Sequence, residues 1–136
     1  MPYMVHFFEQ DCIFAAKITL AMTITDTHTH LYSTEFDEDR NEMIQRAIDA
    51  SVSRFFIPAI DSTFTQSMYD LEKAYPNNIF LMMGLHPTHV KDNYLEELQH
   101  VESELAKRKF FAIGEIGIDL YWDKTHLPQQ QDAFKK

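Results

Sequence analysis

The stretch Thr23-Ile24-Thr25-Asp26-Thr27-His28-Thr29-His30 is a β-branched run that ends in an aspartate and two histidines. Threonine and isoleucine favour a strand because their branched side chains pack well on a pleated surface. Residues two apart in a strand point to the same face, so Asp26, His28 and His30 are expected to share one face. The two imidazoles can then converge on one point. Since histidine is the commonest metal ligand, the stretch predicts a strand with a candidate metal site at its carboxyl end.

Apolar runs and helical stripes alternate along the rest of the sequence. The predicted strands cover residues 23–26, 54–58, 79–85 and 110–118. The predicted helices cover residues 37–53, 63–75 with a capping box at 63–66, 95–105, and a final stretch that opens at Pro128. Continuous apolar strands indicate a parallel sheet that is buried on both faces. Strands that alternate with amphipathic helices predict an α/β fold.

Four strand-and-helix units, each of roughly 25–31 residues, follow one another after residue 22, and this length is close to that of a βαβ unit. A closed barrel of eight such units needs about 250 residues, whereas this chain has 136. The pattern predicts either a small open α/β sheet or four parallel βα units that form the first half of a TIM-like (β/α)8 barrel. We expect residues 23–136 to form this domain and residues 1–22 to be an N-terminal extension outside its core.

The composition narrows the classes of partner. A net charge of -9 argues against a protein that coats nucleic acid through a basic patch. It does not exclude a phosphate-bearing substrate, because a bound divalent metal ion can reverse the local field. The single cysteine, Cys12, cannot form an internal disulfide, so we expect a cytoplasmic protein. The apolar stretch 13–22 is interrupted by Lys17 and is too short for a membrane span, so no membrane association is predicted.

Polar residues stand at the predicted carboxyl ends of the later strands, where ligand-binding groups collect in parallel α/β folds. His86 follows the third strand, Glu115 lies in the fourth, and Asp119 stands at the end of the fourth. Glu115 stands between two glycines amid apolar residues, and an ionised carboxylate is rarely buried unless it is paired or binds a metal. Asp26 could cap a turn or hold an imidazole, and His86 could merely end a strand. The weaker candidates, for orienting a ligand or binding substrate, are Asp26, His86 and Asp119.

Three motifs occur one after another along the chain. They are Asp26-Thr27-His28-Thr29-His30-Leu31, Gly84-Leu85-His86-Pro87 and Gly114-Glu115-Ile116-Gly117-Ile118-Asp119, the last followed by Tyr121-Trp122-Asp123. In order and spacing they resemble the TatD family of metal-dependent hydrolases. The resemblance runs from about Thr23 to the last residue.

The resemblance implies a TIM-like barrel with a centre of two divalent metal ions, Mg²⁺, Mn²⁺ or Zn²⁺, at the carboxyl ends of its strands. It implies hydrolysis of phosphodiester bonds, typically by a deoxyribonuclease, with DNA or another phosphodiester as substrate. His28 and His30 match the first two metal ligands of the family. Glu115 matches the catalytic carboxylate that binds or bridges the metal ions.

The family also takes two histidines and an aspartate from later strands of its barrel. We therefore expect the chain to be the N-terminal half of such an enzyme, inactive by itself. A PHP-type phosphoesterase also opens with a His-x-His strand, although the segment Gly114–Asp119 favours the TatD family. A metal-binding or interaction half-barrel without turnover is a third possibility, and its unpaired strand edges would favour dimers or aggregates. The full-length form shows no strong sign of a stable protein partner.

Overall fold

The computed structural model describes residues 22–136, and the predicted N-terminal extension lies outside these residues apart from Met22. The strands are β1 (Ile24–Asp26), β2 (Val52–Pro58), β3 (Ile79–Met83) and β4 (Ala112–Ile113). The helices are α1 (Arg40–Asp49), α2 (Thr65–Ala74), α3 (Tyr94–Lys107) and α4 (Leu127–Ala133). The short 3-10 turns η1 (Thr34–Phe36), η2 (Ser62–Phe64) and η3 (Pro87–His89) precede α1, α2 and α3. None of the described helices is long and apolar enough to cross a membrane.

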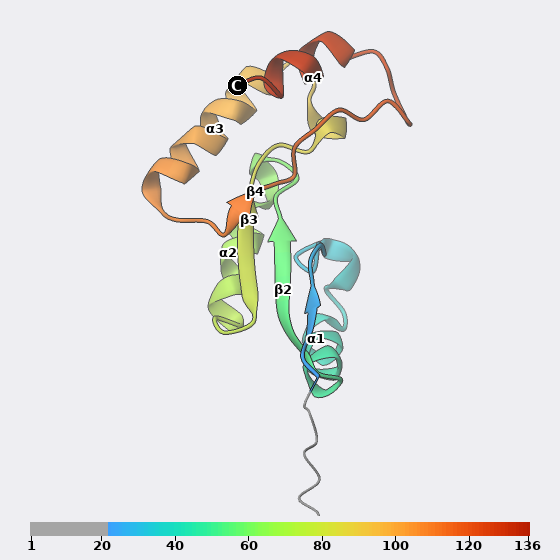
Figure 1. Cartoon of the computed structure of the whole chain (residues 1–136), viewed down its shortest axis with the longest axis vertical. Coiled ribbons are helices and arrows are strands. Elements are labelled where there is room, and N and C mark those ends of the chain that lie inside the picture. The colour runs from blue at the N-terminus through green and yellow to red at the C-terminus, as the bar shows by residue number, and fades with distance from the viewer. Residues whose placement is uncertain (1–21) are drawn as a thin grey trace, which may run out of the picture.

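The four strands form one sheet in the order β1-β2-β3-β4, and every pairing is parallel. A helix follows each strand in the chain (Figure 1). Parallel strands cannot be joined by a tight turn, so each connection returns through a helix to the start of the next strand. The predicted α/β class with four parallel βα units is confirmed.

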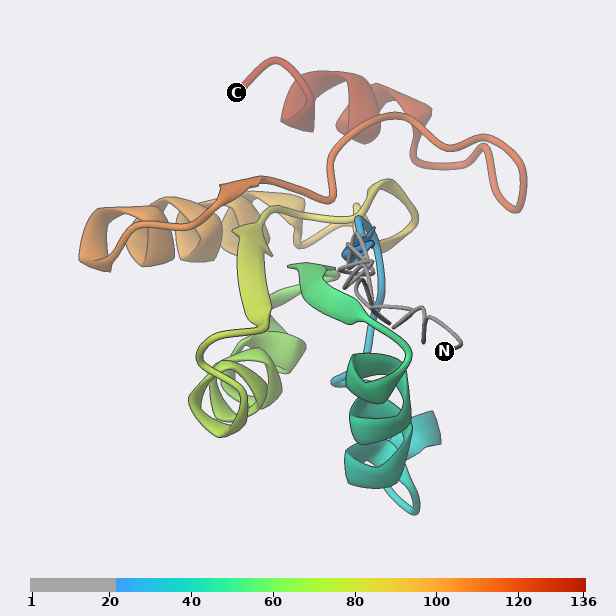
Figure 2. The same ribbon diagram turned by 60° about the horizontal axis from the view of Figure 1, so that its bottom comes forward.

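The hydrophobic core lies on the face of the sheet that α1 and α2 cover. Figure 2 shows both helices on the same side of the strands. Ile57 of β2 and Met68 of α2 are 0% exposed, and Leu81 of β3 is 2% exposed. Along β3 the side chains alternate between buried and half-buried positions. This alternation shows that one face of the sheet is covered and the other is more open.

The prediction that the sheet is buried on both faces is wrong for the described residues. The opposite face carries a cluster of Phe56, Phe80 and Phe111, whose ring centroids are separated by 5.5, 5.1 and 4.8 Å. Phe111 is nevertheless 62% exposed, because no described helix covers this face. The apolar pattern correctly predicted the strands. It does not show which faces of the sheet are covered by helices.

The predicted fourth strand, residues 110–118, is much shorter in the structure, since only β4 pairs with β3. After β4 the chain leaves β3 and crosses to the end of β2. Ala59, which directly follows β2, donates its N–H to the Gly114 carbonyl at 3.1 Å. The Ala59 carbonyl accepts the N–H of Glu115 at 3.2 Å. This pair of backbone hydrogen bonds brings Glu115 to the end of β2.

Two helices begin later than predicted because polar side chains organise the turns before them. The predicted helix at 37–53 begins at Arg40, whose guanidinium donates to the Leu31 carbonyl at 2.7 Å. The predicted capping box at 63–66 does not form. Asp61 instead accepts the N–H of Thr63 at 2.9 Å and caps the 3-10 turn that leads into α2.

One buried carboxylate ties α3 to α2. Glu104 is 5% exposed and accepts hydrogen bonds from Lys107 at 2.6 Å and from the hydroxyl of Tyr69. These hydrogen bonds, with that from Lys107 first, hold the pKa of Glu104 below its ordinary value, although burial acts against the shift. A lowered pKa in the folded state means that the ionised form stabilises the fold. This stabilisation is present above the ordinary glutamate pKa and is lost as the pH falls through the lowered value.

We predict that Glu104→Gln lowers the free energy of unfolding at neutral pH by about 1–3 kcal/mol, the usual cost of disturbing a buried charged hydrogen bond. The deficit should shrink as the pH falls below 4.5, the ordinary value for this carboxyl group, because the unfolded wild-type chain then takes up a proton that the folded carboxylate does not yet bind. Urea unfolding over a series of pH values measures both effects. The exposed Glu102 on the same helix provides the control Glu102→Gln. A deficit that does not change with pH would contradict the prediction.

Candidate metal centre

Three predicted ligands, His28, His30 and Glu115, converge at the carboxyl end of the sheet. The Nε2 atoms of the two imidazoles lie 3.3 Å apart. Glu115 Oε2 lies 3.1 Å from His28 Nε2 and 3.6 Å from His30 Nε2. Atoms that bind one tetrahedral zinc ion at about 2.0–2.2 Å lie about 3.3–3.6 Å from one another. Among residues 22–136, this is the only group of three side chains placed to hold one metal ion.

The two histidines lie in a bend after β1, since the strand itself ends at Asp26. The expectation that all three side chains share one strand face is therefore wrong. Asp26 accepts the backbone N–H of His28 at 3.1 Å, which is the turn-capping role considered for it. The N–H of Thr29 donates to the Phe56 carbonyl of β2 at 3.1 Å. These two hydrogen bonds hold the bend that turns both imidazoles toward Glu115.

The position of Glu115 depends on a glycine at the end of β3. A Cβ atom at Gly84 would lie 2.6 Å from the Glu115 carbonyl oxygen and 2.7 Å from the Gly114 carbonyl carbon. Only glycine permits so close an approach of two backbone segments. The flanking side chains of Ile113 and Ile116 are 54% and 52% exposed, so the apolar residues around Glu115 are not buried as the sequence suggested.

His86 contacts the other oxygen of Glu115. Its Nε2 lies 3.1 Å from Glu115 Oε1, and its Nδ1 accepts the N–H of Thr88 at 3.1 Å. Because Nδ1 accepts a hydrogen bond, the proton of a neutral His86 ring lies on Nε2, the ring nitrogen nearest the carboxylate. His86 is thus placed to hold the carboxylate while Oε2 points at the other two histidines. This geometry suits the positioning role considered for His86.

The site has the donor set that a divalent cation requires. Glu115 Oε2 is buried and has no hydrogen-bond partner among the described residues. Its 3.1 Å approach to His28 Nε2 is an ion-pair distance that lacks hydrogen-bond geometry. Burial, followed by the nearby His28, lowers the pKa of His30, which favours a neutral imidazole with a free lone pair. Two imidazole nitrogens and one carboxylate oxygen fit ions such as Zn²⁺ and Mn²⁺.

Asp119 is not brought to the three ligands by any described contact. It accepts the N–H of Tyr121 at 2.8 Å, and its own N–H donates to the side chain of Gln130 at 2.9 Å. It lines a small cleft together with Lys91 and His126. The described contacts therefore give Asp119 a local role in the turn that leads to α4.

Two polar contacts beside the centre were not predicted from the sequence. The Tyr32 hydroxyl lies 2.8 Å from His30 Nδ1 and donates to the Pro58 carbonyl at 2.8 Å. Asp61 Oδ2 lies 2.6 Å from His89 Nδ1. The only sequence signal for Tyr32 is its spacing of two residues after His30. Such spacing is too common to indicate a contact without knowledge of the fold.

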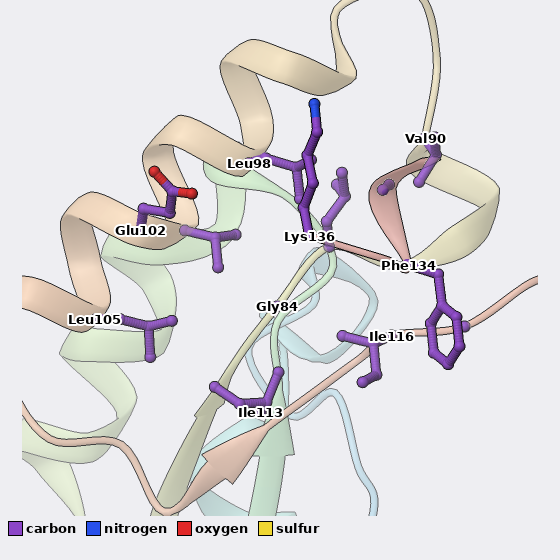
Figure 3. Close-up of a pocket in the computed structure, with 13 residues that line it drawn as sticks. Gly84, Val90, Leu98, Glu102, Leu105, Ile113, Ile116, Phe134 and Lys136 are labelled. Atoms are coloured by element: carbon purple, nitrogen blue, oxygen red, sulfur yellow. The ribbon is translucent and has the colours of Figure 1, made fainter. Parts of the chain in front are cut away.

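An apolar pocket lies apart from the ligands. Figure 3 shows this pocket between α3, the chain after β4 and the C-terminal residues. Its volume is about 380 Å³, and the residues that line it include Leu98, Val101, Leu105, Ile113, Ile116 and Phe134. None of the three ligand side chains lines the pocket. The candidate metal ligands therefore lie at the carboxyl end of the sheet and not in this cavity.

Residues 25–136 match the protein family described as TatD related DNase. The chain belongs to this family. It is 34% identical over 111 residues to the uncharacterized metal-dependent hydrolase YabD of Bacillus subtilis, covering 81% of this chain and 43% of that protein. It is 30% identical over 109 residues to the 3'-5' ssDNA/RNA exonuclease TatD of Pantoea vagans, covering 80% of this chain and 42% of that protein.

A solved TatD structure has the same fold over the matched region. The crystal structure of YjjV, a TatD homologue from Escherichia coli K12, superposes with a TM-score of 0.74 at 29% identity. The match covers 82% of this chain and 44% of that chain. The chain therefore spans less than half the length of the TatD relatives it matches. Its four βα units correspond to the N-terminal half of the TIM-like barrel, as the sequence resemblance implied.

We predict that Gly84→Ala both destabilises the fold and weakens metal binding. The new Cβ must displace the backbone that carries Glu115. Overpacking of this kind costs typically about 1–3 kcal/mol. Urea unfolding and isothermal titration with Mn²⁺ measure the two effects.

A matched control separates the two effects of the glycine substitution. Ile44→Val removes one buried methylene from α1, where Ile44 is 1% exposed, and should cost about 0.5–1.5 kcal/mol. We expect this variant to keep wild-type Mn²⁺ affinity. If Gly84→Ala also binds Mn²⁺ like the wild type, the glycine does not position Glu115.

Proposed function

We propose that this chain supplies the first part of the metal centre of a phosphodiesterase, a TatD-type deoxyribonuclease. The convergence of His28 Nε2, His30 Nε2 and Glu115 Oε2 on one point is the observation that supports this most strongly. One relative is named a metal-dependent hydrolase and another a 3'-5' ssDNA/RNA exonuclease, which supports a hydrolase with a nucleic-acid substrate. Glu115 is the proposed catalytic carboxylate.

Each ligand has a defined task in this proposal. His28 and His30 hold a divalent ion through Nε2, and Glu115 holds it through Oε2. When bound, a divalent ion polarises a phosphate and lowers the pKa of bound water. His86 keeps the carboxylate aimed through its contact with Oε1. Since the chain carries a net charge of -9, approach of a polyanionic substrate depends on positive charge at this site.

We further propose that residues 22–136 do not turn over substrate by themselves. Three donor atoms can hold one ion, whereas the two-metal chemistry implied by the family needs a second ligand set. The described residues contain no second group of three candidate ligands. A non-catalytic interaction module remains the alternative, and it is favoured by the exposure of Phe111 and Ile113, 62% and 54%.

Metal binding tests the proposed ligands directly. We predict that His28→Ala and Glu115→Gln each weaken Mn²⁺ binding by at least about tenfold, because even residues that only support a ligand cost 10–100-fold when removed. Isothermal titration measures the affinities. Asp92→Asn is the control, since this carboxylate is 94% exposed. Undiminished binding by Glu115→Gln would rule out its role as a ligand.

Activity separates the enzyme hypothesis from the interaction module. We expect the purified chain to cleave no appreciable single-stranded DNA with Mg²⁺ or Mn²⁺. A chimera in which residues 23–136 replace the matching part of the Pantoea vagans exonuclease should cleave this substrate, and Glu115→Gln should abolish the cleavage. A metal-dependent signal from the purified chain that Glu115→Gln abolishes would show the first expectation wrong. A folded chimera that binds metal without cleavage would favour the interaction module.

A further inference from the structure

Tyr32 is a buried polar side chain beside the candidate metal centre that the proposed chemistry does not use. It is 3% exposed and its ring packs against Phe64 at a centroid distance of 5.3 Å. Its hydroxyl has two neighbours at 2.8 Å, the carbonyl oxygen of Pro58 and Nδ1 of His30. The phenol ring also meets the His30 ring edge to face at 5.6 Å. Tyr32 therefore joins a candidate ligand to the end of β2.

The two contacts of the hydroxyl determine where the proton of His30 lies. A neutral phenol has one proton to donate, and a carbonyl oxygen can only accept. The hydroxyl of Tyr32 therefore donates its proton in the hydrogen bond to the carbonyl oxygen of Pro58. The oxygen of Tyr32 must then accept a hydrogen bond from Nδ1–H of His30. In a neutral imidazole this leaves Nε2 unprotonated, with its lone pair directed at the site shared with Glu115 and His28.

The side chain of His28 lies in a more open position than that of His30, so solvent can reach it more easily. Its side chain is 50% exposed, whereas that of His30 is 29% exposed. An exposed imidazole can exchange hydrogen bonds with water as it changes tautomer. The enclosed ring of His30 depends more on the partner that the fold provides.

We propose that Tyr32 is the positioning residue of this centre, holding His30 as the Nδ1–H tautomer so that Nε2 is always available to a metal ion. The proposal rests on the proposed metal site. It assigns Tyr32 no contact with substrate or metal. Removing the support of a ligating histidine costs metal affinity because the ring must then be oriented and its tautomer selected during binding.

The first test uses Tyr32→Phe, which deletes only the hydroxyl. We expect about 10–100-fold weaker binding of Zn²⁺ or Mn²⁺, measured by isothermal titration. Tyr69→Phe is the matched control, because it also deletes a hydroxyl that is hydrogen-bonded within the fold, between α2 and α3. The control should lose stability without losing affinity. Equal affinities for wild type and Tyr32→Phe, or equal losses in both variants, would overturn the proposal.

The second test needs neither bound metal nor a folded variant. Long-range ¹H–¹⁵N correlation spectra of the wild-type, metal-free chain report which ring nitrogen of His30 carries the proton. We expect Nδ1 to be protonated and Nε2 to be free. A proton on Nε2 would overturn the proposal. If the chain shows this tautomer but binds no metal at His28, His30 and Glu115, the tautomer assigned to His30 holds and the proposed metal function fails.

Discussion

The paired hydrogen bonds between Ala59 and the Gly114-Glu115 backbone decide what this end of the sheet can do. They join the end of β2 to the chain after β4, across the end of the strand that lies between them. Only a glycine at position 84 leaves room for this crossing. Without it, the carboxylate would continue along the fourth strand and would not meet histidines that follow the first. A backbone contact thus sets the composition of a side-chain site.

The resulting site is electrostatically incomplete without a cation. A buried carboxylate oxygen without a hydrogen bond is costly, and the neighbouring imidazoles offer lone pairs as well as protons. Burial favours the neutral form of His30, so this imidazole does not simply compensate the carboxylate by becoming charged. A divalent ion satisfies all three donors at once. In the proposed function, this charge balance lets a strongly acidic chain present a positive site to a phosphate.

Local sequence patterns were sufficient for the order of the parallel strands and for the three side chains that the structure brings together as candidate ligands. The apolar runs at 54–58 and 79–85 predicted β2 and β3 because buried strands of a parallel sheet need them. The short β4 was missed because its end is set by Ala59, which lies far away in the chain. The hydrogen bond of Tyr32 was missed for the same reason, since its acceptor is the carbonyl oxygen of Pro58. Patterns within one segment do not report partners in another.

The sequential strand order also has a consequence for biosynthesis. Each strand pairs with the one made just before it, so the βα units can dock one after another as the chain emerges. The bend that holds the histidine pair needs only β1 and β2, through the bond from Thr29 to Phe56. The carboxylate arrives only when β4 has docked on β3. In the proposed metal site, binding by His28, His30 and Glu115 together must therefore follow the docking of β4, and it cannot serve as the nucleus of folding.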